Sequence, residues 1–386
     1  MAIDILLIEE LLASEMLWQQ SPSSLRAEAT AMVASLIQDF ARISGLRSAV
    51  LLSPTAAASF CQQQLLPPQV LSVITADGVA AWLQHPNLAP ETIRRLLILA
   101  PEFSNLLVER LAAAESAIWR QTQLINLPSA AAAVFSDKYA TARWLRQHAL
   151  ATPKTWLLTA SQRDTFVQAS GPADAGAASD GQSWFVIKPR DGAGCNQINL
   201  LQLPRDSVRQ LDVVQHSELS GAASSEAAWI LQRRVRGLSC SVSLIGQGTA
   251  GTAIILPPGR QRISRTREGR LQYRGGQIPC EPGAAALITR TAERFAAALG
   301  PFNGWLGIDV VVADSAGYRG KGEDVWIIEV NPRLCTSYIG YRELAGENLA
   351  LRLLRLSDTE SPIHWLTGKV HFNVSGGKAE VGLRDT

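Results

Sequence analysis

The sequence lacks the cysteine patterns that would indicate a disulfide framework or a zinc site. Its 386 residues include an odd number of cysteines and no CxxC pair. They are scattered along the chain, at Cys61, Cys195, Cys240, Cys280 and Cys335. Scattered cysteines without such spacing are typical of proteins from a reducing compartment. The sequence therefore predicts neither a structural disulfide nor a cysteine-bound metal.

Long apolar runs and a strong excess of one charge are also missing. The apolar N-terminal stretch is interrupted by Asp4, Glu9 and Glu10, which argues against a secretory signal. No run approaches the roughly 20 apolar residues that span a bilayer. The formal net charge is only +2, which argues against a generic nucleic-acid or membrane binder. We therefore expect a cytoplasmic protein with no nucleic-acid partner and no membrane contact.

The first third of the chain alternates short apolar segments with helical ones. Turn residues bound four segments that suit buried parallel strands, at residues 3–8, 48–52, 70–74 and 95–100. An alanine-rich helix is expected at 27–45, with Gly45 as its stop. No GxGxxG is present, so a dinucleotide site has no support here. Residues 1–130 are therefore predicted to form a doubly wound α/β domain.

Two glutamates follow strands of this predicted sheet. Glu9 ends the first strand and Glu102 follows the fourth. The carboxyl ends of strands in a doubly wound sheet face the ligand crevice, so either glutamate could orient an amine substrate. For Glu102, capping of the following helix is an equally good interpretation.

Oxygen-bearing side chains end an apolar strand near the C-terminus, in "IIEVNPRL" (327–334). Glu329 and Asn331 lie on one face because strand side chains alternate. If residues 304–314 pair with this strand as a hairpin, Asp309 projects toward the same face. Carboxylate and amide oxygens are the ligands that Mg²⁺ prefers, although these residues could also merely cap a sheet edge. Arg333 follows directly and favours an anionic ligand held between metal and guanidinium.

Lysines and glycines suggest a phosphate site elsewhere in the chain. Lys188 ends the strand in "WFVIKPRDGAGC", and Gly192 and Gly194 follow it. Glycines let backbone N–H groups approach phosphate oxygens, but the GKS/T of a Walker A loop is absent and a plain hairpin would look similar. Lys138, in "SDKYATARWL", is a helical lysine that could equally be solvated.

A basic stretch at 257–279 is predicted to be a long loop. It contains Arg260, Arg262, Arg265, Arg267, Arg270 and Arg274. This loop could be a solvated surface segment. It could also be a lid whose arginines meet a ligand, since closing loops exclude water from a reaction.

The order of these elements resembles the ATP-grasp superfamily over about residues 130–345. The matching segments are "SDKYATARWLRQHALATP", "FVIKPRDGAGC", "ILQRRVRGLSCSVSL", "GWLGIDVVVAD" and "IIEVNPRL". Within the superfamily, "LAPEFSNLL", "PPGRQRI", "YRGGQIP" and "EVNPRLCTSYIGYREL" are most similar to the tyramine–glutamate ligases of methanofuran biosynthesis. The resemblance implies an α/β fold, with α+β lobes: the doubly wound domain (1–130), a small ATP-grasp lobe with the glycine-rich loop (131–235), and a large lobe with the metal site and a C-terminal tail (236–386).

The resemblance also implies a chemistry and a set of site residues. ATP-grasp ligases phosphorylate a carboxylate with ATP, and an amine then displaces the phosphate. ATP would be held by Lys138, Lys188, Gly192 and Gly194, and its adenine edge by Gln232, Arg233, Arg234 and Val235. Mg²⁺, with Mn²⁺ as an alternative, would be held by Asp309, Glu329 and Asn331. Arg333 would act on the transferred phosphoryl group or the substrate carboxylate, joined by Arg260 and Arg274 as catalytic residues.

We accordingly expect a cytoplasmic ligase that joins a carboxylate, such as glutamate, to a small amine in cofactor biosynthesis. A small-molecule kinase and a non-catalytic nucleotide-binding module are the alternatives. The sequence departs from the family at Arg233 and Ser239, since many members carry a glutamate at one of these places. The ribose contact is therefore unassigned. Homodimers are common in the family, and the sequence leaves the oligomeric state open.

Overall fold

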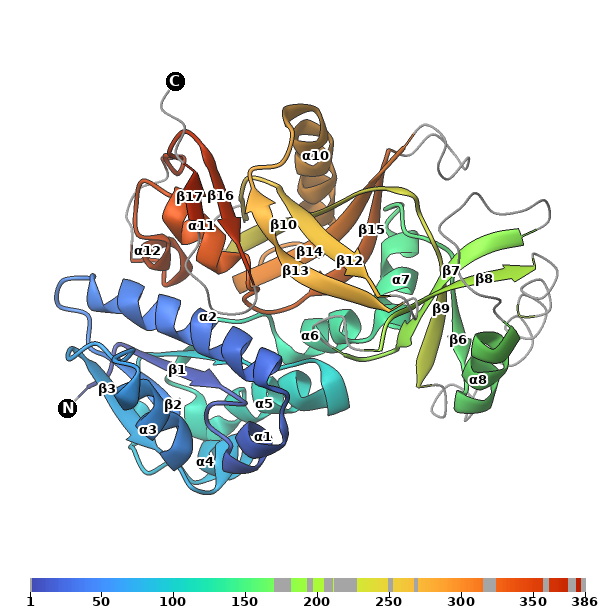
Figure 1. Ribbon diagram of the computed structural model, residues 1–386. Helices are drawn as coiled ribbons and strands as arrows, with labels where there is room; N and C mark the ends of the chain where they lie inside the picture. The colour runs from blue at the N-terminus through green and yellow to red at the C-terminus, as the bar shows by residue number, and fades with distance from the viewer. Residues whose placement is uncertain are drawn as a thin grey trace.

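The computed structural model describes residues 2–169, 182–192, 197–204, 211, 228–248, 253–266, 270–314, 324–356, 361–373 and 380–382. These residues form three β-sheets, which follow one another along the chain and are covered by helices (Figure 1). None of the described helices is long and apolar enough to cross a membrane.

The first sheet is parallel and has strand order β3-β2-β1-β4-β5. Its strands are β1 (Ile5–Glu9), β2 (Ser48–Leu52), β3 (Val70–Ile74), β4 (Arg95–Leu99) and β5 (Gln123–Leu124). Side chains of β1 alternate between two apolar cores, with Ile5 and Leu7 on one face and Leu6 and Ile8 on the other. Burial on both faces explains why these strands are apolar throughout.

Helices cover both faces of this sheet, as expected for a doubly wound domain. They are α1 (Glu15–Gln20), α2 (Ser23–Ala41), α3 (Pro54–Gln62), α4 (Gly78–Gln84) and α5 (Leu106–Ala114). Short 3₁₀ turns lie at η1 (Pro90–Thr92), η2 (Phe103–Asn105) and η3 (Ala117–Trp119). The strand order reverses between β1 and β4, so a ligand crevice is expected beyond their carboxyl ends.

The second sheet is antiparallel, with order β6-β9-β7-β8. Its strands are β6 (Thr155–Leu158), β7 (Gln182–Pro189), β8 (Asn199–Pro204) and β9 (Trp229–Arg233), and α8 (Ala160–Ala169) packs on it. Two helices precede it, α6 (Ser129–Ser136) and α7 (Lys138–Gln147). The buried side chains Phe135 of α6 and Leu145 of α7 pack into the core of the third sheet.

The third sheet has order β15-β14-β10-β12-β13-β16-β17, with β11 paired to β10. Its strands are β10 (Gly237–Gln247), β11 (Ile254–Ile255), β12 (Gly259–Arg265), β13 (Leu271–Ile278), β14 (Asn303–Ala313), β15 (Val325–Asn331), β16 (Lys369–Phe372) and β17 (Glu380–Gly382). Its helices are α10 (Pro282–Leu299), α11 (Tyr338–Leu344) and α12 (Leu349–Leu353).

The prediction of a long loop at 257–279 was wrong. This stretch forms the antiparallel pair β12–β13, with a register shift between Gln261 and Ile263. The many arginines concealed the strands because each strand exposes one face, where charged residues are tolerated. The start of β13 contacts the residue before β8 of the second sheet, since the Leu271 N–H donates to the Ile198 carbonyl at 3.0 Å.

Polar contacts join the first domain to the third sheet. Asp39 of α2 accepts hydrogen bonds from the Arg342 guanidinium at 2.7 and 2.9 Å and from the Tyr338 hydroxyl at 2.6 Å. The Asn348 side-chain amide donates to the Asp39 carbonyl at 2.7 Å. Helix α2 therefore lies against α11 and α12, between the first sheet and the C-terminal part of the chain (Figure 1).

Candidate active site

A cavity of about 500 Å³ lies where the second and third sheets face each other. Ligand pockets typically measure roughly 300–1,000 Å³, so this cavity has the size of a small-molecule site. Residues of β7, β9, β10, β12, β13, β14 and β15 line it, together with Glu28 of α2. The first domain therefore contributes Glu28 to the lining of the cavity.

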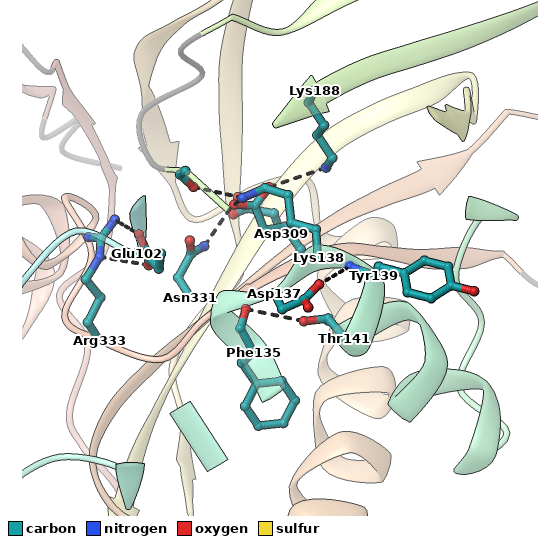
Figure 2. Close-up of polar contacts among 12 residues, drawn as sticks. Glu102, Phe135, Asp137, Lys138, Tyr139, Thr141, Lys188, Asp309, Asn331 and Arg333 are labelled. Carbon is teal, nitrogen blue, oxygen red and sulfur yellow. Dashed lines mark hydrogen bonds and ion pairs between the residues drawn. The ribbon is translucent and has the colours of Figure 1, made fainter. Parts of the chain in front are cut away.

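The hairpin expected near the C-terminus is present and carries the acidic side chains. Strands β14 and β15 pair in antiparallel fashion, with Asp309 opposite Glu329 and Gly307 opposite Asn331. The Asn331 amide donates to Asp309 Oδ2 at 3.5 Å, and all three side chains line the cavity (Figure 2). The alternation of the two strands therefore brings two carboxylates and one amide together, as predicted.

Two buried lysines converge on Glu329 from different elements. Lys138 Nζ lies 3.1 Å from Glu329 Oε1, and Lys188 Nζ lies 3.4 Å from Glu329 Oε2. Their exposed fractions are only 7% and 2%, so neither lysine is a solvated surface residue. Lys138 also donates to the Gly192 carbonyl at 2.8 Å, which ties it to the glycine turn.

Local hydrogen bonds fix Lys138 at the start of α7. Asp137 caps this helix by accepting from the backbone N–H of Tyr139 at 2.9 Å (Figure 2). It also accepts from the Ala140 N–H at 3.0 Å. Its other oxygen pairs with Arg190 at 2.7 Å. The Lys138 N–H donates to the Arg190 carbonyl at 3.0 Å. The cap therefore joins α7 to the end of β7 and sets the two lysines side by side.

Burial and charge set the protonation of this cluster. Burial, with Glu329 as a second cause, raises the pKa of Asp309 to about 7. Burial would also raise the pKa of Glu329, but Lys138 and Lys188 outweigh it and hold this pKa below its usual value. Burial lowers the pKa of Lys188, and Glu329 opposes this shift. The acids are thus balanced by lysine charges.

The donor set fits a hard divalent cation. Carboxylate and amide oxygens suit Mg²⁺, which completes its coordination with water and substrate phosphates. Asp309 and Glu329 lie at paired strand positions, and burial together with the Glu329 charge raises the pKa of Asp309. A cation bound between the two carboxylates would relieve this repulsion. In the described part of the chain, no three His, Cys, Asp or Glu side chains lie close enough together to bind a metal ion. A metal at this site would therefore take its third protein ligand from the side-chain oxygen of Asn331.

The segment after β9 connects the second and third sheets at one end of the cavity. Gln232, Arg233, Arg234 and Val235 all line the cavity. The N–H groups of Arg233 and Arg234 already donate to the Lys154 and Trp184 carbonyls, at 2.9 and 3.0 Å. Gln232 is buried, with its amide 3.2 Å from the Thr155 hydroxyl. Within the described ranges, the Val235 N–H is the donor of this segment that has no backbone partner.

Arg333 lies at the other end of the acidic cluster and reaches into the first domain. It forms a two-pronged ion pair with Glu102, at 2.9 and 3.1 Å, on the far side of Asn331 from Lys188 (Figure 2). Glu102 is only 3% exposed. Burial would lower the pKa of Arg333, but Glu102 outweighs it and raises this pKa. The guanidinium also lines the cavity, so Glu102 fixes its position there.

Arg260 and Arg274 are not brought into this site. Arg260 pairs with Glu281 at 3.0 Å on the surface, and Arg274 donates to Ser264 at 2.9 Å and to Gln272. Neither arginine lines the cavity, whereas Gln261 and other hairpin residues do. The sequence pattern had placed them in a loop, where side chains have no fixed face. Of the predicted glycines, Gly192 lines the cavity and Gly194 lies outside the described residues.

We predict that Arg260→Ala and Arg274→Ala change turnover by less than about threefold. Their side chains face away from the cavity, and exposed ion pairs contribute only about 0–1 kcal/mol. Steady-state rates for the two variants, compared with those for Arg333→Ala, test this expectation. A loss of activity in Arg260→Ala as large as that in Arg333→Ala would contradict it.

Gln261 and Glu28 are among the cavity residues that the sequence did not reveal. The Gln261 amide donates to Asp309 Oδ1 at 2.8 Å and so orients this carboxylate. Glu28 reaches the cavity from α2 and accepts a hydrogen bond from Thr336. Strand alternation could have suggested Gln261 if 259–265 had been predicted as a strand. Nothing in the sequence near Glu28 indicates its position, which depends on how the first domain packs.

The side chain of Glu9, at the carboxyl end of β1, is buried. It is 3% exposed and accepts from the Leu12 N–H at 2.8 Å. Burial, together with the nearby Glu10 charge, raises the pKa of Glu9 to about 8. Glu9 does not line the cavity, so its effect is on stability.

We predict that Glu9 makes the protein less stable as the pH rises from about 4.5 to about 8. In this window the unfolded state loses the proton and the folded state keeps it, so stability falls by up to ~1.4 kcal/mol per pH unit. Glu9→Gln removes this slope and keeps an oxygen acceptor for Leu12. The melting temperature of the variant should therefore rise relative to wild type between pH 5 and pH 8. A constant difference across this range would contradict the assignment.

Comparison of the sequence with models of known protein families identifies the family of this chain. The model for the ATP-grasp domain matches residues 135–337, and the chain belongs to the ATP-grasp family. No protein with a curated description matches the chain by sequence.

Solved structures show the same fold. An ATP-grasp superfamily protein from Archaeoglobus fulgidus matches with TM-score 0.61 and 20% identity, covering 96% of this chain and 92% of that one. An N5-carboxyaminoimidazole ribonucleotide synthetase in complex with ADP matches with TM-score 0.60 and 15% identity, covering 96% and 81%. The biotin carboxylase domain of a Hydrogenobacter thermophilus 2-oxoglutarate carboxylase, in complex with MgADP, matches with TM-score 0.58 and 12% identity, covering 96% and 74%. The α/β first domain and the later antiparallel sheets thus correspond to the ATP-grasp fold.

Proposed function

We propose that this protein is an ATP- and Mg²⁺-dependent ligase that joins a carboxylate to an amine through an acyl phosphate. The observation that carries the proposal is the convergence of Lys138 and Lys188 on Glu329, beside Asp309 and Asn331. Two buried lysines next to an oxygen donor set fit a polyphosphate with its metal. Membership of the ATP-grasp family and solved relatives that bind ADP or MgADP support ATP as this ligand.

The proposed reaction has two steps. An oxygen of the substrate carboxylate attacks the γ-phosphorus of ATP, the bond from this phosphorus to the β–γ bridging oxygen breaks, and ADP leaves. The amine nitrogen then attacks the acyl carbon, inorganic phosphate leaves and the amine gives up a proton. Mg²⁺ would neutralise the charge on the phosphate oxygens. The protein's part is mainly positioning and electrostatic stabilisation.

The charged and polar residues described above have distinct roles in this proposal. Lys138 and Lys188 would hold the phosphate oxygens of ATP. Glu329, which both lysines contact, would be a ligand of Mg²⁺ together with Asp309 and Asn331. The Val235 N–H and the neighbouring backbone hold the adenine edge. Arg333, oriented by Glu102, faces the transferred phosphoryl group or the substrate carboxylate. The Gln261 amide fixes the orientation of the Asp309 carboxylate, which would be a ligand of Mg²⁺.

The substrate pair is an amino acid and a small amine. The likeness of several segments to tyramine–glutamate ligases makes glutamate and tyramine the first pair to test, which would place the protein in methanofuran-type cofactor biosynthesis. The test is incubation with ATP, Mg²⁺ and a panel of amino acids and amines, followed by phosphate release and product mass. ADP formation that requires both a carboxylate and an amine supports the ligase.

The same assay separates the alternatives. ADP formation with a carboxylate alone, yielding a stable phosphorylated product, would instead identify a small-molecule kinase. ATP binding without turnover on any pair would identify a non-catalytic nucleotide-binding module.

A further inference from the structure

We propose that Glu28 binds the ammonium group of an α-amino acid, and that this amino acid is the substrate whose carboxylate is phosphorylated. This inference rests on the proposed ligase function and identifies one residue that selects the substrate class. Glu28 lies on α2, in the first domain, and lines the same cavity as the acidic cluster.

The position of Glu28 is tied to the segment that follows β15. Thr336 donates a hydrogen bond to Glu28 Oε1 through its hydroxyl. Asn331 ends β15, and Arg333 and Thr336 follow within five residues, before α11 begins. One short segment therefore runs from the metal-binding end of the cavity to Glu28.

Glu28 has no counter-ion among the described residues, whereas three buried carboxylates at this domain junction do. Glu10 pairs with Arg110 at 2.9 Å, Glu102 with Arg333 at 2.9 Å, and Asp39 with Arg342 at 2.7 Å. In the described ranges, no lysine, arginine or histidine nitrogen lies within 4.0 Å of the Glu28 carboxylate. Arg333, which is close enough to feel its charge, is already held on both prongs by Glu102. A half-buried carboxylate in a cavity is best balanced by a cation from the ligand.

The walls near Glu28 carry several hydroxyl groups, and Arg333, a charged side chain close to it, is already paired with Glu102. Ser241 and Ser243 of β10 and Ser337 line the cavity, and the hydroxyls of Ser243 and Ser337 lie 3.2 Å apart. Ser241 pairs with Asp309 in the strand register, so the hydroxyls run toward the acidic cluster. This lining suits a small zwitterion that extends from Glu28 to the metal.

Chemistry decides which amino group Glu28 binds. The amine that attacks an acyl phosphate must be neutral, whereas a neighbouring carboxylate keeps an amino group protonated. Glu28 therefore suits the amino group that does not react, which is the ammonium of the amino acid. The carboxylate of the same molecule then points toward Asp309 and Asn331, where it meets the γ-phosphate.

The test compares an amino acid with the same molecule lacking its amino group. With MgATP and tyramine, wild type should use L-glutamate and use glutarate poorly; if another amino acid is the best substrate, its des-amino analogue replaces glutarate. Glu28→Gln should raise the KM for the amino acid by about 10- to 100-fold, as expected for loss of a charge-assisted bond. The KM for ATP should stay within about twofold. Equal use of the des-amino analogue by wild type, or an unchanged KM in the variant, would overturn the inference and leave the ligase proposal intact.

Two further variants test whether Glu28 binds the amino acid or only stabilises the turn that contains Thr336. Thr336→Val removes the same hydrogen bond and keeps the Glu28 charge, so its KM for the amino acid should rise far less than in Glu28→Gln. An equal rise would show that Glu28 merely holds the turn. Glu109→Gln, at a 55% exposed side chain of the same domain, is the matched control for loss of a glutamate charge.

A binding experiment tests the role of Glu28 even if the protein turns out not to be a ligase. If no carboxylate supports turnover, titration calorimetry of the amino-acid panel in the presence of MgADP decides. Binding by wild type that weakens at least about tenfold in Glu28→Gln would support the inference. No binding by wild type, or equal binding by the variant, would overturn it.

Discussion

Glu329→Gln should reduce ligation by about 1,000-fold or more and leave a folded protein. The substitution removes one carboxylate from the donor set and the charge that pairs with Lys138 and Lys188. Both lysines are buried, so the variant also loses stability, which breaking a buried pair lowers by about 3–5 kcal/mol. Lys188 can release its proton more readily, because burial already lowers its pKa and Glu329 is what opposes this.

The measurement combines turnover, circular dichroism and thermal melting. Glu281→Gln is the matched control, since Glu281 also pairs with a basic residue, Arg260, but on the surface and outside the cavity. We expect the control to keep its rate and its melting temperature. Near-normal turnover in Glu329→Gln would contradict the assignment of Glu329 to the active site.

Glu102→Gln should lower turnover by about 100-fold, and stability by about 3–5 kcal/mol, because it leaves the buried Arg333 without its partner. Glu102 is 3% exposed and Arg333 carries 14% side-chain exposure, so water cannot replace the lost bonds well. The guanidinium would also lose its fixed direction, and a small misplacement in an active site can cost about 100-fold in rate.

Denaturant unfolding and steady-state kinetics measure the two effects separately. The interpretation of Glu102 as a helix cap was wrong, because its side chain makes no capping hydrogen bond to the following turn. If the ion pair with Arg333 contributed nothing, the variant would lose no more than about 1 kcal/mol and keep its rate. Such a result would contradict the positioning role.

The gathering of Asp309, Glu329 and Asn331 could be predicted from the sequence because its geometry is local. Strand alternation fixes Glu329 and Asn331 on one face, and a single hairpin brings Asp309 opposite Glu329. Lys188 and the parallel strands of the first domain follow from equally local patterns. The resemblance to ATP-grasp proteins added Lys138, whose helical surroundings alone gave no reason to prefer it.

The rest depends on contacts between distant segments. Arg260 and Arg274 were assigned to a lid because charge suggested a loop, but β12–β13 pairing turns these side chains away from the cavity. Glu102 and Arg333 are separated by more than two hundred residues, and only the packing of the first domain makes them partners. Glu28 is revealed in the same way, through α2 lying against the third sheet.

The central claim, that a substrate carboxylate is phosphorylated by ATP, has one direct test. The protein is given ATP, Mg²⁺, the amine and the carboxylate substrate labelled with ¹⁸O in the reacting carboxyl group, and the released phosphate is analysed by mass spectrometry. An acyl phosphate transfers one carboxyl oxygen to phosphorus, so we predict phosphate carrying one ¹⁸O atom in amounts equal to the amide formed. Unlabelled phosphate released with the amide would contradict the account.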